Sequence, residues 1–99
     1  MDHINLSTGE IEYKGIKANL TRNELKIVDK LNRASGVVTY EEIYEAIFNI
    51  KPNVLRVKER KAITVHISRI RAKIPTLLIL NRNGFGYELK RKVVNNGKV

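Results

Sequence analysis

The chain has 99 residues, of which 19 are lysine or arginine and 10 are aspartate or glutamate, and its formal net charge is +9. A chain this short forms one small domain, and the absence of cysteine excludes disulfides and thiolate metal sites. The first residues lack a secretory signal and no apolar run could span a bilayer, so we expect a cytoplasmic protein with no membrane partner.

The first twenty residues alternate apolar and polar side chains in three short bursts, beginning with Ile4 and Leu6. Turn signals separate these bursts at residues 7–9 and at Lys14-Gly15. The pattern predicts three short strands of an antiparallel sheet. So small a sheet is not stable alone, and we expect it to pack against helices.

Two capping boxes mark the starts of the first two helices. The Thr21 hydroxyl and the Glu24 carboxylate can each satisfy a free backbone donor in a first helical turn. Thr39 and Glu42 repeat this pattern eighteen residues later. We expect the first helix to run to about Ala34, and the two valines before Thr39 to form a short apolar link.

A third, basic helix is predicted over about residues 58–74, with Pro75 ending it. Its isoleucines recur at steps of four, three and four, so they lie within about 60° of one another on a helix. They are Ile63, Ile67, Ile70 and Ile74. We expect this ridge to point into the core. The opposite face carries basic side chains and nothing bulky at its centre, which suits close approach to base edges.

The residues after the third helix predict a β-hairpin over about residues 77–90. Residues 77–80 are a continuous apolar run that suits a buried strand. Asn83-Gly84 is a strong signal for a two-residue turn, because both positions of such a turn prefer positive φ. Alternating apolar residues are then expected at inward positions of the returning strand: Phe85, Tyr87 and Leu89.

The order of strands, three helices and a hairpin predicts an α+β fold. Its architecture is a winged helix-turn-helix with a short N-terminal antiparallel sheet and a C-terminal β-hairpin wing. We expect the domain to span residues 1–92 and residues 93–99 to form a flexible polar tail.

The positive charge is concentrated in the second half of the chain. Residues 1–50 hold 6 basic and 8 acidic side chains, whereas residues 51–73 hold 8 basic and 1 acidic. The third helix therefore carries most of the positive field, which favours a polyanionic partner such as nucleic acid.

Four motifs carry a resemblance to a known family. They are Leu20-Thr21-x-x-Glu24-Leu25, Val38-Thr39-x-Glu41-Glu42-Ile43, the run from Val65 to Ile74, and Gly84-Phe85-Gly86-Tyr87. In this order and spacing the chain resembles the DNA-binding effector domain of the OmpR/PhoB family of bacterial response regulators. The resemblance implies a regulator of transcription that binds double-stranded DNA as head-to-tail copies on tandem half-sites. It also implies that the loop at residues 49–57 is available to RNA polymerase.

The helical face and the resemblance select largely the same residues for DNA contact. Base contacts are expected from Thr64, Val65, Ser68 and Arg69. Contacts to bases or phosphates are expected from Lys61, Arg71, Lys73 and Tyr40. Wing contacts are expected from Arg82 and Asn83. Asn83 replaces the family's wing arginine, and Arg82 lies one position earlier, which argues against its insertion into the minor groove.

Further departures from the family pattern bear on which DNA bases the domain contacts and on how its activity is regulated. Thr64 stands where the family has an acidic residue and Ser68 where it often has a basic one, so the bases read should differ. Phe48 replaces a tryptophan near the end of the second helix. Family members commonly carry a receiver domain, and these residues contain none. If the protein begins at Met1, we expect no switching by phosphorylation in cis.

Other functional classes have less support in the sequence. No constellation of catalytic residues is visible, so we expect neither an enzyme nor a cofactor. His3 and His66 are isolated, so we expect no metal site. An alternative hypothesis is a winged-helix adaptor that docks proteins through residues 50–57 and the wing and binds DNA only weakly. A membrane-surface role would need a broad apolar face, which the core already requires.

Overall fold

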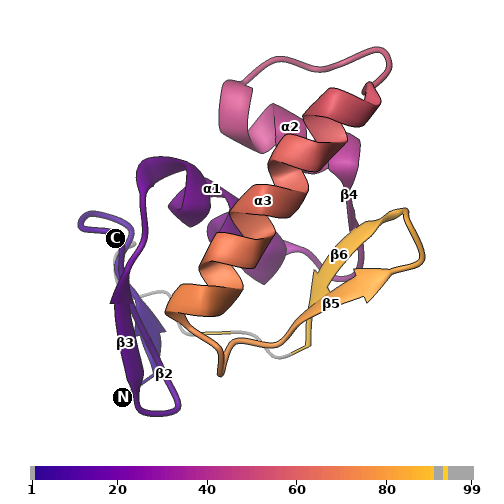
Figure 1. Cartoon of the computed structure of the whole chain (residues 1–99). Coiled ribbons are helices and arrows are strands. Elements are labelled where there is room, and N and C mark those ends of the chain that lie inside the picture. The colour runs from indigo at the N-terminus through magenta and orange to yellow at the C-terminus, as the bar shows by residue number, and fades with distance from the viewer. Residues whose placement is uncertain (1, 91–92, 94–99) are drawn as a thin grey trace.

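The structure is a computed structural model and describes residues 2–90 and 93. Its elements follow the predicted order: β1 (His3–Ile4), β2 (Glu10–Tyr13), β3 (Ile16–Asn19), α1 (Arg22–Arg33), β4 (Val38–Thr39), α2 (Tyr40–Phe48), α3 (Val57–Lys73), β5 (Ile79–Arg82) and β6 (Gly86–Leu89). In Figure 1, α3 crosses the front of the molecule with α1 and α2 behind it. The end of α3 points toward β2 and β3, and the β5–β6 hairpin stands to one side. The predicted winged helix-turn-helix is confirmed.

The N-terminal sheet has the expected three strands. They are antiparallel and lie in the order β1-β2-β3, with Ile4 opposite Ile11 and Ile11 opposite Ala18. Ile11 is fully buried and Tyr13 nearly so, because alternate side chains of β2 face the helices. The sheet thus packs against the helices, as its small size requires.

A second sheet joins the hairpin to the start of α2. Its strand order is β4-β6-β5, with Val38 opposite Tyr87. The two valines before Thr39 were predicted to form only a short apolar link, and this was wrong, because Val38 and Thr39 form strand β4. A strand of two residues is too short to show the alternation of side chains by which strands are predicted. Its hydrogen-bonding partner also lies far along the sequence. The wing is therefore attached to the residue that caps α2, Thr39.

The capping boxes form as predicted at the starts of α1 and α2. The Thr21 hydroxyl accepts from the Glu24 backbone N–H at 3.2 Å, and the Glu24 carboxylate accepts from the Thr21 N–H at 2.9 Å. Thr39 and Glu42 make the same pair of bonds at 3.1 and 2.9 Å. These local patterns fix where the two helices begin.

The third helix begins one residue earlier than expected and ends one residue earlier, at Lys73. The Glu59 carboxylate accepts from the Arg56 backbone N–H at 2.9 Å and so satisfies a free donor at its start. Ile74 leaves the helical region with φ −138° and ψ 77°, immediately before Pro75. The chain then turns toward the hairpin.

The core lies where α3 meets α1 and α2. The four isoleucines of the α3 ridge, including Ile74 just beyond the helix, are at most 1% exposed. They share a single buried cluster with apolar residues of the other helices, among them Ile27 and Leu31 of α1 and Ile43 of α2. The predicted inward orientation of the ridge is confirmed.

The turn of the hairpin forms at Asn83-Gly84, as predicted. Both residues have positive φ, 49° and 77°, which suits the twist of the two strands. The Phe85 N–H donates to the Arg82 carbonyl at 2.9 Å, but the strand ladder pairs Arg82 with Gly86. Phe85 is therefore an extra residue at the turn, and such a bulge shifts the alternation of side chains.

The bulge corrects the prediction for the returning strand. Tyr87 and Leu89 are buried as expected, but Phe85 is 73% exposed. The preceding strand also begins later than expected, at Ile79, and Leu78 is exposed. Phe85 thus lies on the outside of the wing.

Val93, the first residue of the predicted tail, packs against α1. Val93 is 4% exposed, and its backbone exchanges two hydrogen bonds of 2.7 Å with the Asn32 side chain on α1. The rest of the predicted tail, residues 94–99, lies outside the described residues.

Candidate nucleic-acid interface

The solvent side of α3 carries an exposed surface that we call the reading face. It consists of Lys61, Val65, Ser68, Arg69 and Ala72. Because the isoleucine ridge is buried on the other side of the same helix, these residues must point outward. Val65 lies at the middle of this face and is 46% exposed. The centre of the reading face is therefore apolar. Small side chains beside it leave room for a partner to approach the helix closely.

Two cations of the reading face have no partner among residues 2–90 and 93. Lys61 and Arg69 are both exposed, and no hydrogen bond or ion pair holds either side chain. Arg60, by contrast, lies 3.8 Å from the Glu41 carboxylate and stacks 5.2 Å from the centre of the Tyr40 ring. The free cations are the ones that an external anion would meet.

Thr64 lies beside the reading face and Ser68 within it. The Thr64 hydroxyl donates to the Arg60 carbonyl at 3.0 Å, one helical turn back. Its oxygen retains acceptor capacity. The Ser68 hydroxyl is exposed and can donate as well as accept.

Arg71, predicted to contact bases or phosphates, joins α3 to the hairpin. Its guanidinium donates to the Ile79 carbonyl at 2.6 Å and lies 5.8 Å from the centre of the Tyr87 ring. This contact holds the start of β5 against α3. We therefore assign Arg71 to the positioning of the wing.

Tyr40, also predicted to contact phosphate, is buried at the junction of α2 and the wing. It is 8% exposed, and its hydroxyl donates to the Tyr87 hydroxyl at 3.4 Å, with the two rings edge to face. The hydrogen bond with Tyr87 and burial raise the pKa of Tyr40, so its hydroxyl stays neutral. This hydroxyl serves the packing of the domain.

Lys73, also predicted to contact bases or phosphates, forms a salt bridge across the fold. Its ammonium lies 2.6 Å from the Glu24 carboxylate and donates to the Asn19 carbonyl at 3.2 Å. Lys73 therefore ties the end of α3 to the start of α1 and to β3. Lys73 thus helps to position α3, and its predicted contact with DNA stays a prediction.

Glu24 is the only buried charged residue in the described part of the chain, at 2% exposed. Burial is the largest influence and by itself raises the pKa of the carboxyl. The hydrogen bonds from Lys73 and from the Thr21 backbone, together with the Lys73 charge, outweigh it and lower the pKa below its ordinary value of 4.5. Glu24 is thus held ionised between two helix ends.

The predicted wing residues occupy the turn and the strand before it. Arg82 lies 2.9 Å from the Glu88 carboxylate on the neighbouring strand, so its charge is partly neutralised within the wing. Asn83 supplies the left-handed backbone of the turn. Phe85, not selected from the sequence, is the most exposed large apolar residue of the wing.

The family described as "Transcriptional regulatory protein, C terminal" matches residues 15–89, which include all three helices and the hairpin. The chain belongs to this family. It is accordingly a DNA-binding domain of transcription regulators of the OmpR/PhoB type, which is not a class of enzymes. Among curated proteins, none matches this chain.

Two solved structures share the fold of this OmpR/PhoB-type domain. The DNA-binding domain of Bacillus subtilis CssR is 21% identical, with a TM-score of 0.65, and the similarity covers 81% of this chain and 89% of that one. The DNA-binding domain of the response regulator AdeR, solved in complex with an intercistronic region, is 24% identical, with a TM-score of 0.66 and coverage of 87% and 90%. Both likenesses extend over nearly the whole domain.

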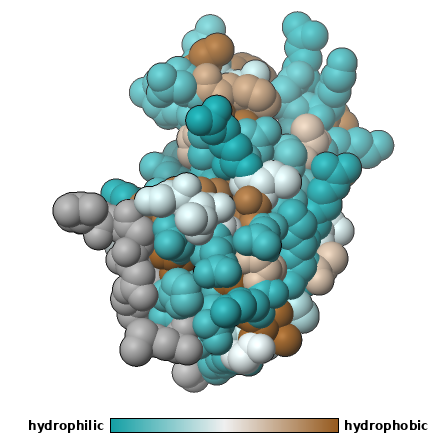
Figure 2. Space-filling view, turned by 90° about the vertical axis from the view of Figure 1, so that its left-hand side faces the viewer, coloured by the Kyte–Doolittle hydropathy of each residue, from teal (hydrophilic) through white to brown (hydrophobic). Residues whose placement is uncertain are grey.

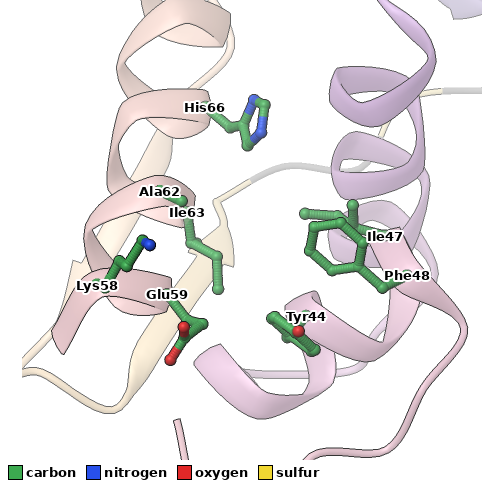
Figure 3. Close-up of a pocket in the computed structure, with 8 residues that line it drawn as sticks. All are labelled: Tyr44, Ile47, Phe48, Lys58, Glu59, Ala62, Ile63 and His66. Atoms are coloured by element: carbon green, nitrogen blue, oxygen red, sulfur yellow. The ribbon is translucent and has the colours of Figure 1, made fainter. Parts of the chain in front are cut away.

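An apolar hollow of about 250 Å³ lies between α2 and α3 of this domain. It is lined by Tyr44, Ile47, Phe48, Lys58, Glu59, Ala62, Ile63 and His66. In Figure 3, His66 projects from α3 toward α2, and its Nδ1 is buried without a hydrogen-bond partner in the described structure. His66 therefore faces the helix packing and not the reading face.

The loop between α2 and α3 exposes several apolar side chains. Ile50, Val54 and Val57 are 62, 80 and 76% exposed, and Phe48 at the end of α2 is half exposed. Figure 2 shows apolar residues at the upper end of the molecule, the end at which this loop lies in Figure 1, and others in the middle and at the lower edge of a largely hydrophilic face. These exposed apolar side chains make this loop a candidate docking surface.

The described residues hold neither a metal site nor a membrane span. No group of three or more potential ligands among them could hold a metal ion. Within the same residues, no helix is long and apolar enough to cross a bilayer.

Proposed function

We propose that this domain is a sequence-specific regulator of transcription that binds double-stranded DNA with α3 in the major groove. One observation carries the proposal: α3 buries its isoleucine ridge and presents to solvent a slender face with unpaired cations. A face of this width and charge suits the major groove, whose edges distinguish all four base pairs. The β5–β6 wing then lies on the backbone or in the adjacent minor groove.

The side chains divide into two roles in this proposal. Val65, Ser68 and Arg69 contact base edges, and Thr64 reaches a base through its free lone pairs. Lys61 contacts a phosphate, because an ammonium on a flexible stem carries no planar pattern for a base. The wing residues Arg82, Asn83 and Phe85 contact the sugar-phosphate backbone.

The first prediction separates base reading from phosphate binding. Arg69→Ala is expected to reduce the preference for the selected sequence over unrelated DNA by about 5- to 150-fold, since a bidentate contact contributes about 1–3 kcal/mol of discrimination. Lys61→Ala should weaken binding to all sequences similarly and reduce the salt dependence by about one ion. Both are measured by titrating labelled duplexes at several salt concentrations.

The preferred DNA sequence is found by selection from a random duplex library. Footprinting at about 0.15 M salt then shows which bases the protein protects. In line with the family resemblance, two copies of the domain should protect two half-sites in the same orientation. Lys17→Ala is the matched control for Arg69→Ala and Lys61→Ala, because Lys17 is an exposed lysine on β3, away from the reading face. Weak and sequence-blind binding by the unaltered domain would instead support the adaptor hypothesis.

We further propose that the loop at residues 49–57 docks a protein partner, which the family resemblance identifies as RNA polymerase. The exposed valines Val54 and Val57 support this role, because apolar side chains this exposed contribute nothing to the core. The loop also precedes the helix that would be inserted into DNA, so a partner bound there would stand beside the promoter.

The second prediction tests this docking surface. Val54→Ser with Val57→Ser should reduce recruitment of RNA polymerase to promoter-bound protein by about tenfold or more, as expected for the apolar centre of an interface. DNA affinity should not change. Val37→Ser is the control, since Val37 is exposed at 41% but lies outside the loop. Unchanged recruitment by the double variant would remove the loop from the interface.

A further inference from the structure

The chemistry available on α3 limits which bases the reading face can recognise. Residues 60–73 contain no asparagine, glutamine, aspartate or glutamate. Asn and Gln are the side chains that pair bidentately with adenine, and carboxylates are the ones that accept from the cytosine amino group. The nearest carboxylate, Glu59, is used to cap the helix. Direct reading of adenine or cytosine by these groups is therefore excluded.

Among the arginines of α3, only Arg69 makes no hydrogen bond or ion pair within the described part of the chain. Arg60 pairs with Glu41, and Arg71 is held by the Ile79 carbonyl. Arg69 has no partner in the described residues and lies on the reading face. Its planar guanidinium matches the O6 and N7 acceptors of guanine.

Val65 lies one helical turn before Arg69 on the same face. Val65 is half exposed and lies outside the buried core cluster, and β-branched residues are weak helix formers. Its methyl groups match the one apolar feature of the major groove, the C5-methyl of thymine.

The spacing of the two side chains fixes the spacing of the two bases. Four residues of α-helix rise about 6 Å, whereas successive base pairs are about 3.4 Å apart. Recognition helices inclined to the groove read successive bases with residues about three positions apart. The two contacts therefore fall on base pairs that are adjacent or separated by one.

We propose that each half-site is defined by a guanine read by Arg69 and, one or two base pairs away, a thymine whose methyl contacts Val65. The inference rests on the proposed DNA-binding function and specifies its target. Ser68, which can donate or accept, tolerates any base beside them.

The test replaces single atoms of the selected duplex. Changing the thymine to deoxyuridine removes only the methyl and should weaken binding of the unaltered domain about three- to tenfold, as expected for burial of one methyl group. Val65→Ala should lose this sensitivity. Changing the guanine to 7-deazaguanine removes N7 and should weaken the unaltered domain but not Arg69→Ala.

Two results would overturn the inference while leaving the proposed function intact. One is a selected half-site without a thymine within two base pairs of the protected guanine. The other is an equal loss with deoxyuridine for Val65→Ala and the unaltered domain. Failure of the library to yield any preferred sequence would refute both the proposed function and the inference.

Discussion

Lys73→Met is expected to lower the free energy of unfolding by about 2 kcal/mol, because this lysine pairs with the buried Glu24 carboxylate. The substitution removes the ammonium that lies 2.6 Å from a carboxylate that is itself 2% exposed. A buried charge that loses its partner is costly, and partial exposure of Lys73 reduces the effect below that of a fully buried pair. Urea unfolding followed by circular dichroism measures the change.

Lys73→Met should also change how the stability of the domain depends on pH. In the unaltered domain the folded-state pKa of Glu24 lies below its ordinary value of 4.5. The stability from this ionised group is therefore complete above about pH 4.5 and is lost as pH falls through the folded-state pKa. Without Lys73, only the hydrogen bonds with Thr21 counteract the effect of burial on the pKa of Glu24. The pKa therefore rises, and the protonated carboxyl is favoured. The stability difference between the two proteins should narrow below pH 4.5.

A double-mutant cycle attributes the loss to the pair. Glu24→Gln removes the charge but keeps an oxygen that can accept from the Thr21 N–H. The double variant should be more stable than the sum of the single effects implies, because no unpaired carboxylate remains buried. Lys61→Met is the matched control on the same helix and should change stability by less than about 0.5 kcal/mol. A similar loss for both lysines would refute a specific role for the salt bridge.

The salt bridge bears on function through the placement of α3. Lys73 fixes the end of the helix to α1 and β3, and Arg71 fixes its flank to the start of β5. The reading face thus belongs to a helix held at several points by its own cations. Arg60, Arg71 and Lys73 contact other parts of the described structure, whereas Lys61 and Arg69 do not.

The sequence predicted those features that depend on neighbouring residues. The capping boxes at Thr21 and Thr39, the isoleucine ridge of α3 and the Asn83-Gly84 turn are local patterns, and each has the expected structure. The inward and outward sides of α3 followed from its period alone. These patterns were sufficient to predict the fold and the side of α3 that faces solvent.

The features that the sequence did not predict depend on contacts between distant residues. Whether Lys73 is free depends on Glu24, which lies 49 positions earlier, and the hydroxyl of Tyr40 meets that of Tyr87, 47 positions later. Helical position alone cannot show such pairings. The outward direction of Phe85 depends on a bulge at the turn, which a strict alternation of strand residues cannot anticipate.

Gly86→Ala is expected to be more destabilising than Lys73→Met, because β4 passes directly over this glycine. A Cβ at position 86 would overlap the Val38 carbonyl oxygen and lie 2.7 Å from the Val38 carbonyl carbon and 2.8 Å from the Thr39 Cα. These are backbone atoms, so no side-chain rotation relieves the overlap, and β4 must separate from β6. We expect a loss of about 3 kcal/mol or more, beyond the usual cost of overpacking.

Gly84→Ala supplies the matched control within the same hairpin. Gly84 has φ +77° but open space around it, so alanine there should cost only about 1 kcal/mol of backbone strain. Thermal unfolding of both variants compares the two losses of stability.

Strand β4 contains Thr39, the N-cap of α2. Displacement of β4 in the Gly86→Ala variant should therefore disturb both the wing and the start of α2. Amide hydrogen exchange should then rise at Tyr40 and Tyr87 in this variant and not in the control. Equal stability of the two variants would show that β4 does not pair closely with the wing, and the attachment of the wing to α2 would have to be abandoned.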